Sequence, residues 1–354
     1  MTILWINLAI VFIFSFFARY FSMPAMNGPL FIKPNRLMVF VVILSLVLVS
    51  GLRKNIGDTF FYMHSYVQDD FSWEGVKSRK DVGFGILQMF LKIFSNDPQI
   101  LIFTTALITN TLIVVTLYKY ARIFELSLYV YITSGQYLVS MNGIRQFLAA
   151  AIIFAATKYI FEGNWKRYFL VVLFAMTIHQ SAFILIPIYF LIRSKAWSKT
   201  TFMLLSLAIL IVIGFNQFTA ALFTAIESTQ YSNYQTFSEG GANVLRVGVD
   251  AVPLVLAYLG RERLRELFPK SDYVVNLSLL GVVFMLIATQ NWIFARFSIY
   301  FGLYQLILIS WVVKLFIKES QKLVYYAILV CYFIFCYYEQ VITLNVIYKS
   351  NFWG

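Results

Sequence analysis

Four arginines and a histidine lie where long apolar segments begin, end or are interrupted: Arg53, Arg145, Arg246, Arg296 and His179. If these segments cross a membrane, an ionised side chain costs about 2.5–3.5 kcal/mol at mid-bilayer, and its presence needs a reason. Guanidinium groups bind phosphate oxygens in a bidentate geometry and keep their charge at any pH. Histidine can accept a proton near neutral pH. These residue types predict a site for an anionic ligand, most naturally phosphate, with one candidate base.

Each arginine also has an ordinary explanation, which the sequence leaves open. Arg53 is followed five residues later by Asp58, so the two could form a local ion pair in an exit loop. Arg145 could meet a lipid phosphate from an interfacial turn. Arg246 could extend to the membrane surface, whereas Arg296 lies about one turn inside its segment and would have to point straight outward to do so.

His179 interrupts the longest apolar stretch of the chain, followed by Gln180-Ser181-Ala182. A lone histidine in such a place is often a hydrogen-bonded structural residue, and this alternative also stays open. A position on the same face of the membrane as the arginines favours a general base. The other histidine, His64, lies in a loop and is expected to be solvated.

Several kinds of chemistry have no motif in this sequence. It contains no P-loop, no Rossmann glycine motif, no His-Glu-x-x-His and no acidic cluster of the kind that holds a catalytic metal. The two cysteines, Cys331 and Cys336, predict neither a disulfide framework nor a metal site. We therefore expect no nucleotide, metal or other cofactor.

The elements that position these residues must come from an unusually apolar chain. Of its 354 residues, 60% are apolar and 12% charged, too few charged residues to cover a soluble protein of this size. The composition excludes a soluble enzyme, a DNA-binding domain and a disordered chain, and continuous apolar runs exclude a β-barrel. It predicts an all-α, polytopic integral membrane protein, in which a net charge of +12 reflects orientation rather than nucleic-acid binding.

About twelve transmembrane helices are predicted, although several of the segments are shorter than the roughly 20 residues of a perpendicular span. The first lacks a basic leader and a cleavage site, so we expect a retained span rather than a signal peptide. The predicted segments are 3–18, 37–52, 99–118, 125–140, 146–161, 167–179, 181–192, 201–216, 243–259, 273–289, 293–313 and 323–338.

The basic residues predict the orientation of these helices, because cytoplasmic loops collect Lys and Arg. With the N-terminus outside, 18 Lys and Arg residues fall inside and 10 outside, while 6 acidic residues fall inside and 10 outside. The sequence therefore predicts that both termini face out. The apolar run 168–192 has basic residues on both flanks, which favours a helical hairpin with its tip near His179 over a single span.

A single transmembrane domain over 1–354 is expected, with two outer loops at about 53–98 and 216–242. Residues 84–94 place Phe84, Leu87, Phe90, Leu91 and Phe94 at helical spacing but are too few to cross a membrane. They predict an interfacial helix on the outer face.

At these positions the sequence resembles the EpsG family of bacterial exopolysaccharide polymerases, which belongs with the Wzy-type O-antigen polymerases. The resemblance covers nearly the whole chain. Six motifs carry it, in order and at matching spacing: Gly51-Leu52-Arg53 with Ile56-Gly57-Asp58-Thr59, Asn142-Gly143-Ile144-Arg145-Gln146, Gly163-Asn164-Trp165-Lys166-Arg167-Tyr168-Phe169-Leu170, His179-Gln180-Ser181-Ala182, Asp272-Tyr273-Val274-Val275-Asn276-Leu277 and Phe294-Ala295-Arg296-Phe297. One departure is that many relatives read Gly-Thr-Asp where this chain has Gly57-Asp58-Thr59.

The resemblance implies a GT-C-like helical fold and a metal-independent glycosyltransferase that joins oligosaccharide repeat units at the outer face of the bacterial cell membrane. The units are carried on undecaprenyl pyrophosphate, and the lipid pyrophosphate is the leaving group. Other exopolysaccharide, biofilm or capsule machinery, such as a flippase and a chain-length regulator, would be its partners. A ligase for lipid-linked glycans is the closest alternative, and a lipid-linked sugar flippase is the alternative from another class.

Under this hypothesis three arginines, Arg53, Arg145 and Arg296, hold the pyrophosphate. His179 is the general base or orients the acceptor hydroxyl, and Asp58 positions Arg53 or the acceptor. Further candidates for the site are Arg246, Asn142 and Gln146.

Overall fold

The structure is a computed structural model, and it describes residues 1–24, 30, 32–225 and 240–352. Apart from two antiparallel strands of two residues each, β1 (Met23–Pro24) and β2 (Ile32–Lys33), the regular elements of these residues are helices. The predicted all-α class is therefore confirmed. By the packing of its backbone the chain divides into two compact units, residues 1–189 with 309–354 (unit 1) and residues 190–308 (unit 2).

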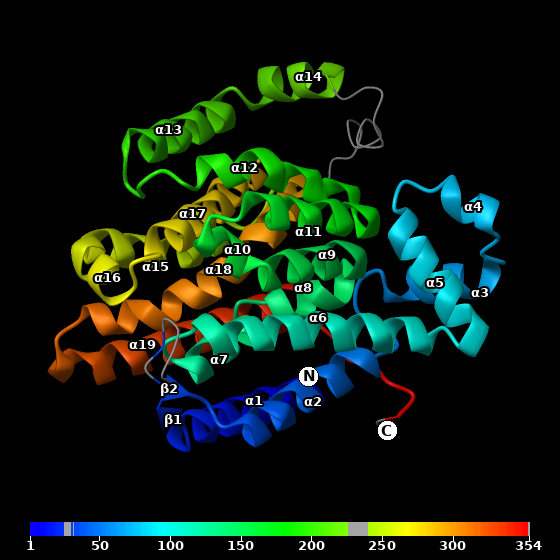
Figure 1. The fold of residues 1–354 in the computed structure, drawn as a ribbon, viewed down its shortest axis with the longest axis horizontal. Coiled ribbons are helices and arrows are strands. Elements are labelled where there is room, and N and C mark those ends of the chain that lie inside the picture. Colours follow the sequence, from blue (N-terminus) through cyan, green and yellow to red (C-terminus); the bar gives the residue numbers. More distant parts are fainter. Residues whose placement is uncertain (25–29, 31, 226–239, 353–354) are drawn as a thin grey trace. The chain divides into compact units, whose positions relative to one another are not determined.

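Unit 1 is built on long helices that run back and forth along one another (Figure 1). α1 packs on α2 and α7, and α6 packs on α2 and α9. Its elements are α1 (Thr2–Tyr20), α2 (Arg36–Gly51), α3 (Thr59–Gln68), α4 (Trp73–Lys77), α5 (Val82–Phe94), α6 (Gln99–Tyr120), α7 (Phe124–Thr133), α8 (Gln136–Asn142), α9 (Ile144–Ala155), α10 (Thr157–Glu162), α11 (Trp165–Ile178), the 3-10 helix η1 (Gln180–Ile184), most of α12 (Leu185–Leu191), the 3-10 helix η4 (Val313–Leu315), α19 (Lys318–Cys336) and the π-helix η5 (Tyr337–Thr343).

Unit 2 has α17 as its central helix, with α13 and α15 packed on it. Its elements are α13 (Lys199–Ile213), α14 (Phe215–Ala225), α15 (Val244–Leu259), α16 (Arg261–Leu267), α17 (Ser271–Ala288), the 3-10 helix η3 (Trp292–Phe294) and most of α18 (Ala295–Val312). The loop predicted over 216–242 thus begins as helix α14, and its part from 226 to 239 lies outside the described residues. That the chain acts as one membrane domain stays a prediction.

Five helical segments of the described residues are long and apolar enough to cross a membrane. They are Thr2–Tyr20, Gln99–Tyr120, Ser271–Ala288, Trp292–Leu315 and Lys318–Thr343, and a sixth span results if α13 and α14, bent by 97°, count as one. The other predicted segments fold as shorter or broken helices. The segment 125–140, for example, breaks at Gly135, whose φ of +83° favours a residue without a Cβ.

The reversal of the chain predicted for the hairpin over 168–192 is present in unit 1. α11 ends at Ile178, His179 is extended, and the chain returns through η1 and α12. The rings of Tyr168 and Tyr189, near the open end of the hairpin, stack with centroids 5.2 Å apart. The chain therefore reverses near His179, as the basic flanks predict.

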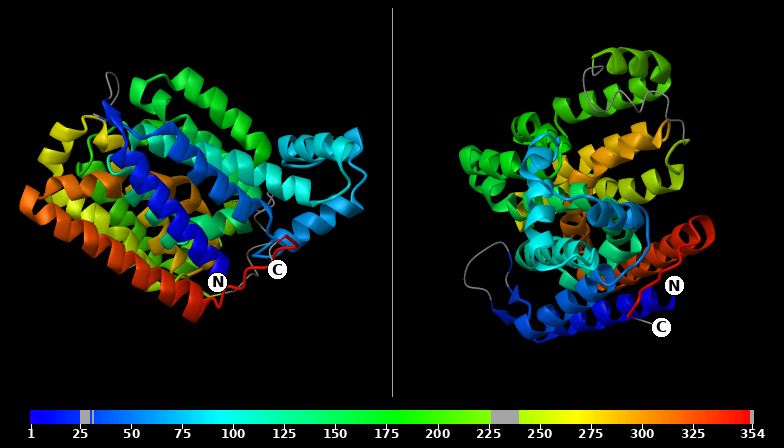
Figure 2. Two further views of the ribbon diagram at one scale, coloured as in Figure 1. Left: turned by 90° about the horizontal axis from the view of Figure 1, so that it is seen from below. Right: turned by 90° about the vertical axis from the view of Figure 1, so that its right-hand side faces the viewer.

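The helix predicted over 84–94 is present as α5, which begins two residues earlier. It buries Phe84, Gln88 and Leu91 on one face and leaves an apolar surface with Ile86 and Phe90 exposed on the other. Figure 1 and Figure 2 show α3, α4 and α5 grouped at one end of α6. Whether α5 lies on the outer membrane surface stays a prediction.

The long helices of unit 1 place two sets of residues at opposite ends. Arg19 and Lys119 lie in the last turns of α1 and α6. Arg53 follows the end of α2, which runs antiparallel to α1, and Gln99 at the start of α6 donates to the carbonyl oxygen of Arg53. Residues predicted inside and residues predicted outside thus lie at different ends of these helices.

Candidate functional site

Arg53 is the most deeply buried cation of the candidate site, with 1% of its surface exposed. Its Nε donates to Thr59 Oγ1 at 3.0 Å, its Nη2 donates to the carbonyl oxygen of Met141 at 2.6 Å, and its Nη1 donates to the carbonyl oxygen of Ser50. No carboxylate oxygen of the described residues lies within 4 Å of it. Burial lowers the pKa of the guanidinium to about 10. Arg53 is thus a buried cation held by neutral oxygens.

The turn before α3 contacts the turn before α9 through two motif residues. The backbone N–H of Asp58 donates to Asn142 Oδ1 at 2.9 Å. Gly57 has a φ of +52°, and a Cβ at this position would lie 2.1 Å from Asn142 Oδ1. The turn therefore requires glycine, both for its backbone conformation and for the close approach of Asn142.

Asp58 does not pair with Arg53, although both were expected to act together. Its half-exposed carboxylate forms no hydrogen bond or ion pair with the residues that the structure describes. The neighbouring Thr59 contacts Arg53 instead, and its hydroxyl donates to the carbonyl oxygen of Ile56. The hypothesis of a local Arg53–Asp58 ion pair is therefore wrong for this structure.

Arg145, in the first turn of α9, forms an ion pair in which its Nη1 lies 2.7 Å from Asp81 Oδ2. Its guanidinium carbon lies 5.7 Å from the ring centroid of Tyr62 and 5.9 Å from that of Phe84. The Arg145 side chain is 40% exposed, whereas that of Asp81 is 9% exposed. Arg145 thus combines an aromatic support, a carboxylate partner and access from outside.

Asp81 connects three segments of unit 1, and the sequence did not identify it. Besides Arg145, it accepts a hydrogen bond on Oδ1 from the backbone N–H of Gln180, at 3.0 Å. Burial raises the pKa of Asp81, while Arg145 and the Gln180 N–H oppose this rise. Its only signal in the sequence is an acidic residue directly before the amphipathic segment that becomes α5.

His179 directly precedes Gln180, whose backbone N–H contacts Asp81, and α5 and α11 approach closely here. A Cβ on Gly83 would lie 2.2 Å from Thr177 Oγ1, so a larger residue would separate the two helices. The Nδ1 of His179 lies 2.7 Å from Ser181 Oγ, and Gln146 Nε2 donates to the same hydroxyl at 3.4 Å. Gln146 and Ser181 are buried and His179 is half-buried.

Unit 1 therefore brings together most of the predicted site at one end of its helices: Arg53, Asp58, Asn142, Arg145, Gln146 and His179. The buried positive charge of Arg53 and the half-exposed Arg145 favour an anion. An anionic ligand could replace Asp81 on Arg145, and His179 lies two residues from the Ser181 hydroxyl that fixes its ring. Such a site can bind a phosphate group and move one proton.

Arg296 and Arg246, the remaining predicted residues, belong to unit 2. The guanidinium carbon of Arg296 lies 5.1 Å from the ring centroid of Trp292, and both residues are half-exposed. The turn before α18 is fixed by Asn291, which accepts a hydrogen bond from the backbone N–H of Ile293. Arg246 lies in the first turn of α15, which Asn243 caps.

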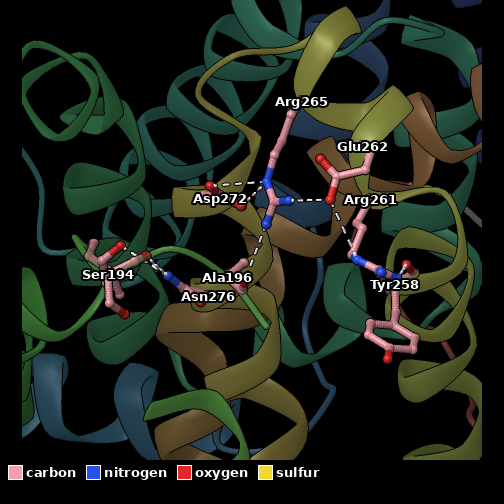
Figure 3. A network of polar contacts seen from close by, with 9 residues as sticks. Ser194, Ala196, Tyr258, Arg261, Glu262, Arg265, Asp272 and Asn276 are labelled. Carbon is pink, nitrogen blue, oxygen red and sulfur yellow. Dashed lines mark hydrogen bonds and ion pairs between the residues drawn. The ribbon is translucent and has the colours of Figure 1, made fainter. Parts of the chain in front are cut away.

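Unit 2 also contains a second arginine network, shown in Figure 3. Arg265 contacts Asp272 through Nε at 3.1 Å, Glu262 through Nη1 at 2.9 Å and the carbonyl oxygen of Ala196 through Nη2 at 3.1 Å. Asn276 donates to the carbonyl oxygens of Ile192 and Ser194. Asp272 and Asn276, both from a family motif, thus join α16, α17 and the segment before α13.

No group of three or more His, Cys, Asp or Glu side chains that could hold a metal ion occurs among the described residues. The absence of a metal requirement stays a prediction.

The model of the EpsG family matches residues 36–351 of the chain. No curated protein and no solved structure matches it significantly.

Proposed function

The chain belongs to the EpsG family, and from this premise we propose that it is a polymerase that joins lipid-linked oligosaccharide repeat units into an exopolysaccharide. It is a membrane protein by its apolar helices and its family. The growing chain, linked to undecaprenyl pyrophosphate, is the donor, and a hydroxyl of the incoming unit is the acceptor. One observation supports this proposal above all: the motif segments of Arg145 and Gln180 meet at Asp81, beside the buried Arg53 of a third motif segment, which has no carboxylate partner among the described residues.

The bond that breaks joins the anomeric carbon to the pyrophosphate oxygen, and the bond that forms joins the same carbon to the acceptor oxygen. The pyrophosphate leaves with the electron pair of the broken bond, so positive charge beside it lowers the barrier. Arg145 would exchange Asp81 for a phosphate oxygen. Inversion at the anomeric carbon follows from attack opposite to the leaving group.

Arg53 takes a different role from the direct phosphate contact that the sequence suggested. Its three nitrogen atoms are occupied by protein oxygens, and one of these bonds fixes the carbonyl of Met141, four residues before Arg145. We therefore assign Arg53 to positioning the turn that presents Arg145, with its uncompensated charge adding to the attraction for the anion.

His179 is assigned to take the proton of the acceptor hydroxyl. The contact with Ser181 fixes the ring through Nδ1, which leaves the proton transfer to Nε2. The half-exposed carboxylate of Asp58 lies at the same end of unit 1 and is the alternative base, or it positions the acceptor. Arg296 is proposed to bind phosphate as the family motif implies, and Arg246, Asn142 and Gln146 are further candidates.

The arrangement in the membrane is part of the proposal. Twelve passes in a GT-C-like fold, with both termini outside the bacterial cell membrane, would place the Arg145 end of unit 1 at the outer face. A flippase would then supply the lipid-linked units, and a chain-length regulator would act on the product. Cysteine labelling with an impermeant reagent tests this topology, in a background without Cys331 and Cys336. Labelling of a cysteine at position 193 from outside intact cells would contradict it.

The direct experiment supplies purified protein with a lipid-linked repeat unit and separates the products by size. A polymerase gives a ladder of products, and this ladder should persist in EDTA without added nucleotide. A ligase gives a single transfer to another acceptor and no ladder, and a flippase gives no covalent product. Activity that EDTA abolishes and magnesium restores would contradict the metal-independent mechanism.

A further inference from the structure

The last described residues of the chain lie against the loop that carries Arg53. We call residues Leu52–Asn55 the Arg53 loop and residues Asn345–Ser350 the C-terminal segment. The backbone N–H of Lys54 donates to the carbonyl oxygen of Lys349 at 2.8 Å, and the hydroxyl of Ser350 donates to the carbonyl oxygen of Leu52 at 2.6 Å. Figure 2 shows this segment, in red, beside the end of α2.

Asn55 recognises the C-terminal segment through both ends of its amide. Its Nδ2 donates to the carbonyl oxygen of Ile347 at 2.6 Å, and its Oδ1 accepts from the backbone N–H of Lys349 at 2.7 Å. These two groups belong to residues two apart, so the amide bonds to the segment much as a neighbouring β-strand would. The contact thus satisfies one backbone acceptor and one backbone donor of an extended segment.

The C-terminal segment is also anchored to the last turn of α2. The side chain of Tyr348 is buried, and its hydroxyl donates to the carbonyl oxygen of Val49 in the last turn of α2, at 2.9 Å. On the other side of the loop, Gln99 Nε2 donates to the carbonyl oxygens of Gly51 and Arg53, at 2.6 and 3.2 Å. The loop backbone is thus held between α6 and the C-terminal segment.

The side chain of Arg53 connects this loop to the candidate site. The backbone of the loop is held by Gln99 and the C-terminal segment, and the side chain of Arg53 points away from them between the helices. It donates to the carbonyl oxygen of Met141, which precedes the turn of Asn142 and Arg145. Burying a guanidinium without a carboxylate partner is unfavourable, so the loop must be fixed for this conformation to persist.

We propose that the C-terminal segment is a positioning element of the site: through Asn55 it holds the Arg53 loop, keeps Arg53 buried, and so fixes the turn that presents Arg145. Asn55 is accordingly a positioning residue, not a catalytic one. Its effect on activity rests on the proposed function, whereas its effect on the burial of Arg53 does not.

The test measures the modification of Arg53 by phenylglyoxal, followed by peptide mass spectrometry, in the purified full-length protein. The variant is Asn55→Ala, and Asn96→Ala is the matched control, because Asn96 is an exposed asparagine at the same end of unit 1. Losing two hydrogen bonds should raise the rate of modification at Arg53 by at least about tenfold. Asn96→Ala and the wild type should stay protected, and the half-exposed Arg145 should react in all three.

Two further measurements separate positioning from general unfolding. The buried thiol of Cys336 should stay unreactive toward a thiol reagent in Asn55→Ala, while a variant that ends after Leu344 should expose Arg53 at least as much as Asn55→Ala does. The proposal is overturned if Arg53 stays protected in both variants, or if Cys336 becomes reactive in parallel with Arg53 in Asn55→Ala. If the proposed function is correct, exposure of Arg53 accompanies a loss of polymer; exposure of Arg53 with normal polymer overturns the positioning role, whereas a wild type that makes no polymer contradicts the proposed function alone.

Discussion

Arg53 in unit 1 is a buried arginine of a family motif, and Arg265 in unit 2 is a partly buried arginine that contacts one, but their charges are neutralised differently. Arg265 contacts two carboxylates, those of Glu262 and Asp272, and its side chain keeps 18% exposure. Arg53 is 1% exposed and contacts no carboxylate of the described residues. The more deeply buried cation is the one without a counter-ion.

This difference indicates which arginines have a structural role. A guanidinium whose charge is balanced by carboxylates of the protein, as at Arg265, holds elements together and has no need of an anionic ligand. A region with excess positive charge is less stable by itself, and an anion that binds there recovers part of this cost. The Arg53 and Arg145 region is therefore the candidate site, and the Arg265 network is its structural counterpart.

The largest expected effect is at His179, in the unit 1 region. If His179 is the base, the rate of polymer synthesis should fall about 10²–10⁴-fold in His179→Gln, because glutamine forms hydrogen bonds but cannot accept the proton. Its activity should also rise with pH through its pKa, and this acid limb should disappear in His179→Gln. His64→Gln, at the exposed histidine stacked on Phe60, is the control. A loss of tenfold or less with an unchanged pH profile would assign His179 a structural role and make Asp58 the next candidate.

The next effect is at Arg145, where lysine keeps the charge but not the planar fork. Arg145→Lys should reduce polymer synthesis about 10²–10³-fold, the usual cost of one donor to a developing negative charge. Arg79→Lys is a matched control, since Arg79 also pairs with a carboxylate, at 2.8 Å from Asp69, and is 33% exposed. Both variants should accumulate normally in the membrane. Full activity of Arg145→Lys would falsify bidentate phosphate binding at this position.

In unit 2 the expected effect is on stability instead of rate. Asp272→Asn removes one carboxylate from Arg265 and should cost about 1–2 kcal/mol of unfolding free energy, because the pair is partly buried. Glu262→Gln should cost less, since Glu262 is 70% exposed. Melting temperatures and activity per folded molecule are the measurements. A strong loss of activity in Asp272→Asn at normal stability would break the distinction between the two regions.

The smallest effect is the pH dependence of stability at Asp81. Burial raises its pKa above the ordinary value of 3.8, so the folded protein binds this proton more tightly than the unfolded chain. Its contribution to the unfolding free energy is therefore present at low pH and lost as the pH rises through the raised pKa. The measurement is the melting temperature of the wild type and of Asp81→Asn as a function of pH. The stability of the wild type minus that of the variant should fall as the pH rises above the ordinary value of 3.8. A difference that rises with pH would show that the ion pair with Arg145 outweighs burial.

The sequence predicted the features that depend on composition and on neighbouring residues. Apolar content predicted the helical class, the basic flanks predicted the reversal at His179, and helical spacing predicted α5. The breaks inside predicted spans, such as that at Gly135, were missed because hydropathy averages over a window that one residue scarcely changes.

The contacts of the site could not be predicted, because they join residues far apart in the chain. Asp81 is 64 residues from Arg145 and 99 from Gln180, and its role depends on how α5 packs against α11. Likewise, the pairing of Asn55 with the C-terminal segment spans more than 290 residues. Residue types identified the arginines, but only burial separates Arg53, which is enclosed by protein oxygens, from Arg145, which is accessible from outside.

The central claim is that the unit 1 region binds the lipid pyrophosphate. The most direct measurement is the affinity of purified protein in detergent for undecaprenyl pyrophosphate, compared among the wild type, Arg145→Lys and Arg265→Lys. The account predicts a dissociation constant at least about tenfold higher for Arg145→Lys, equal to about 1.4 kcal/mol of binding free energy, and an unchanged value for Arg265→Lys. Equal affinities for the wild type and Arg145→Lys, or a loss confined to Arg265→Lys, would contradict it.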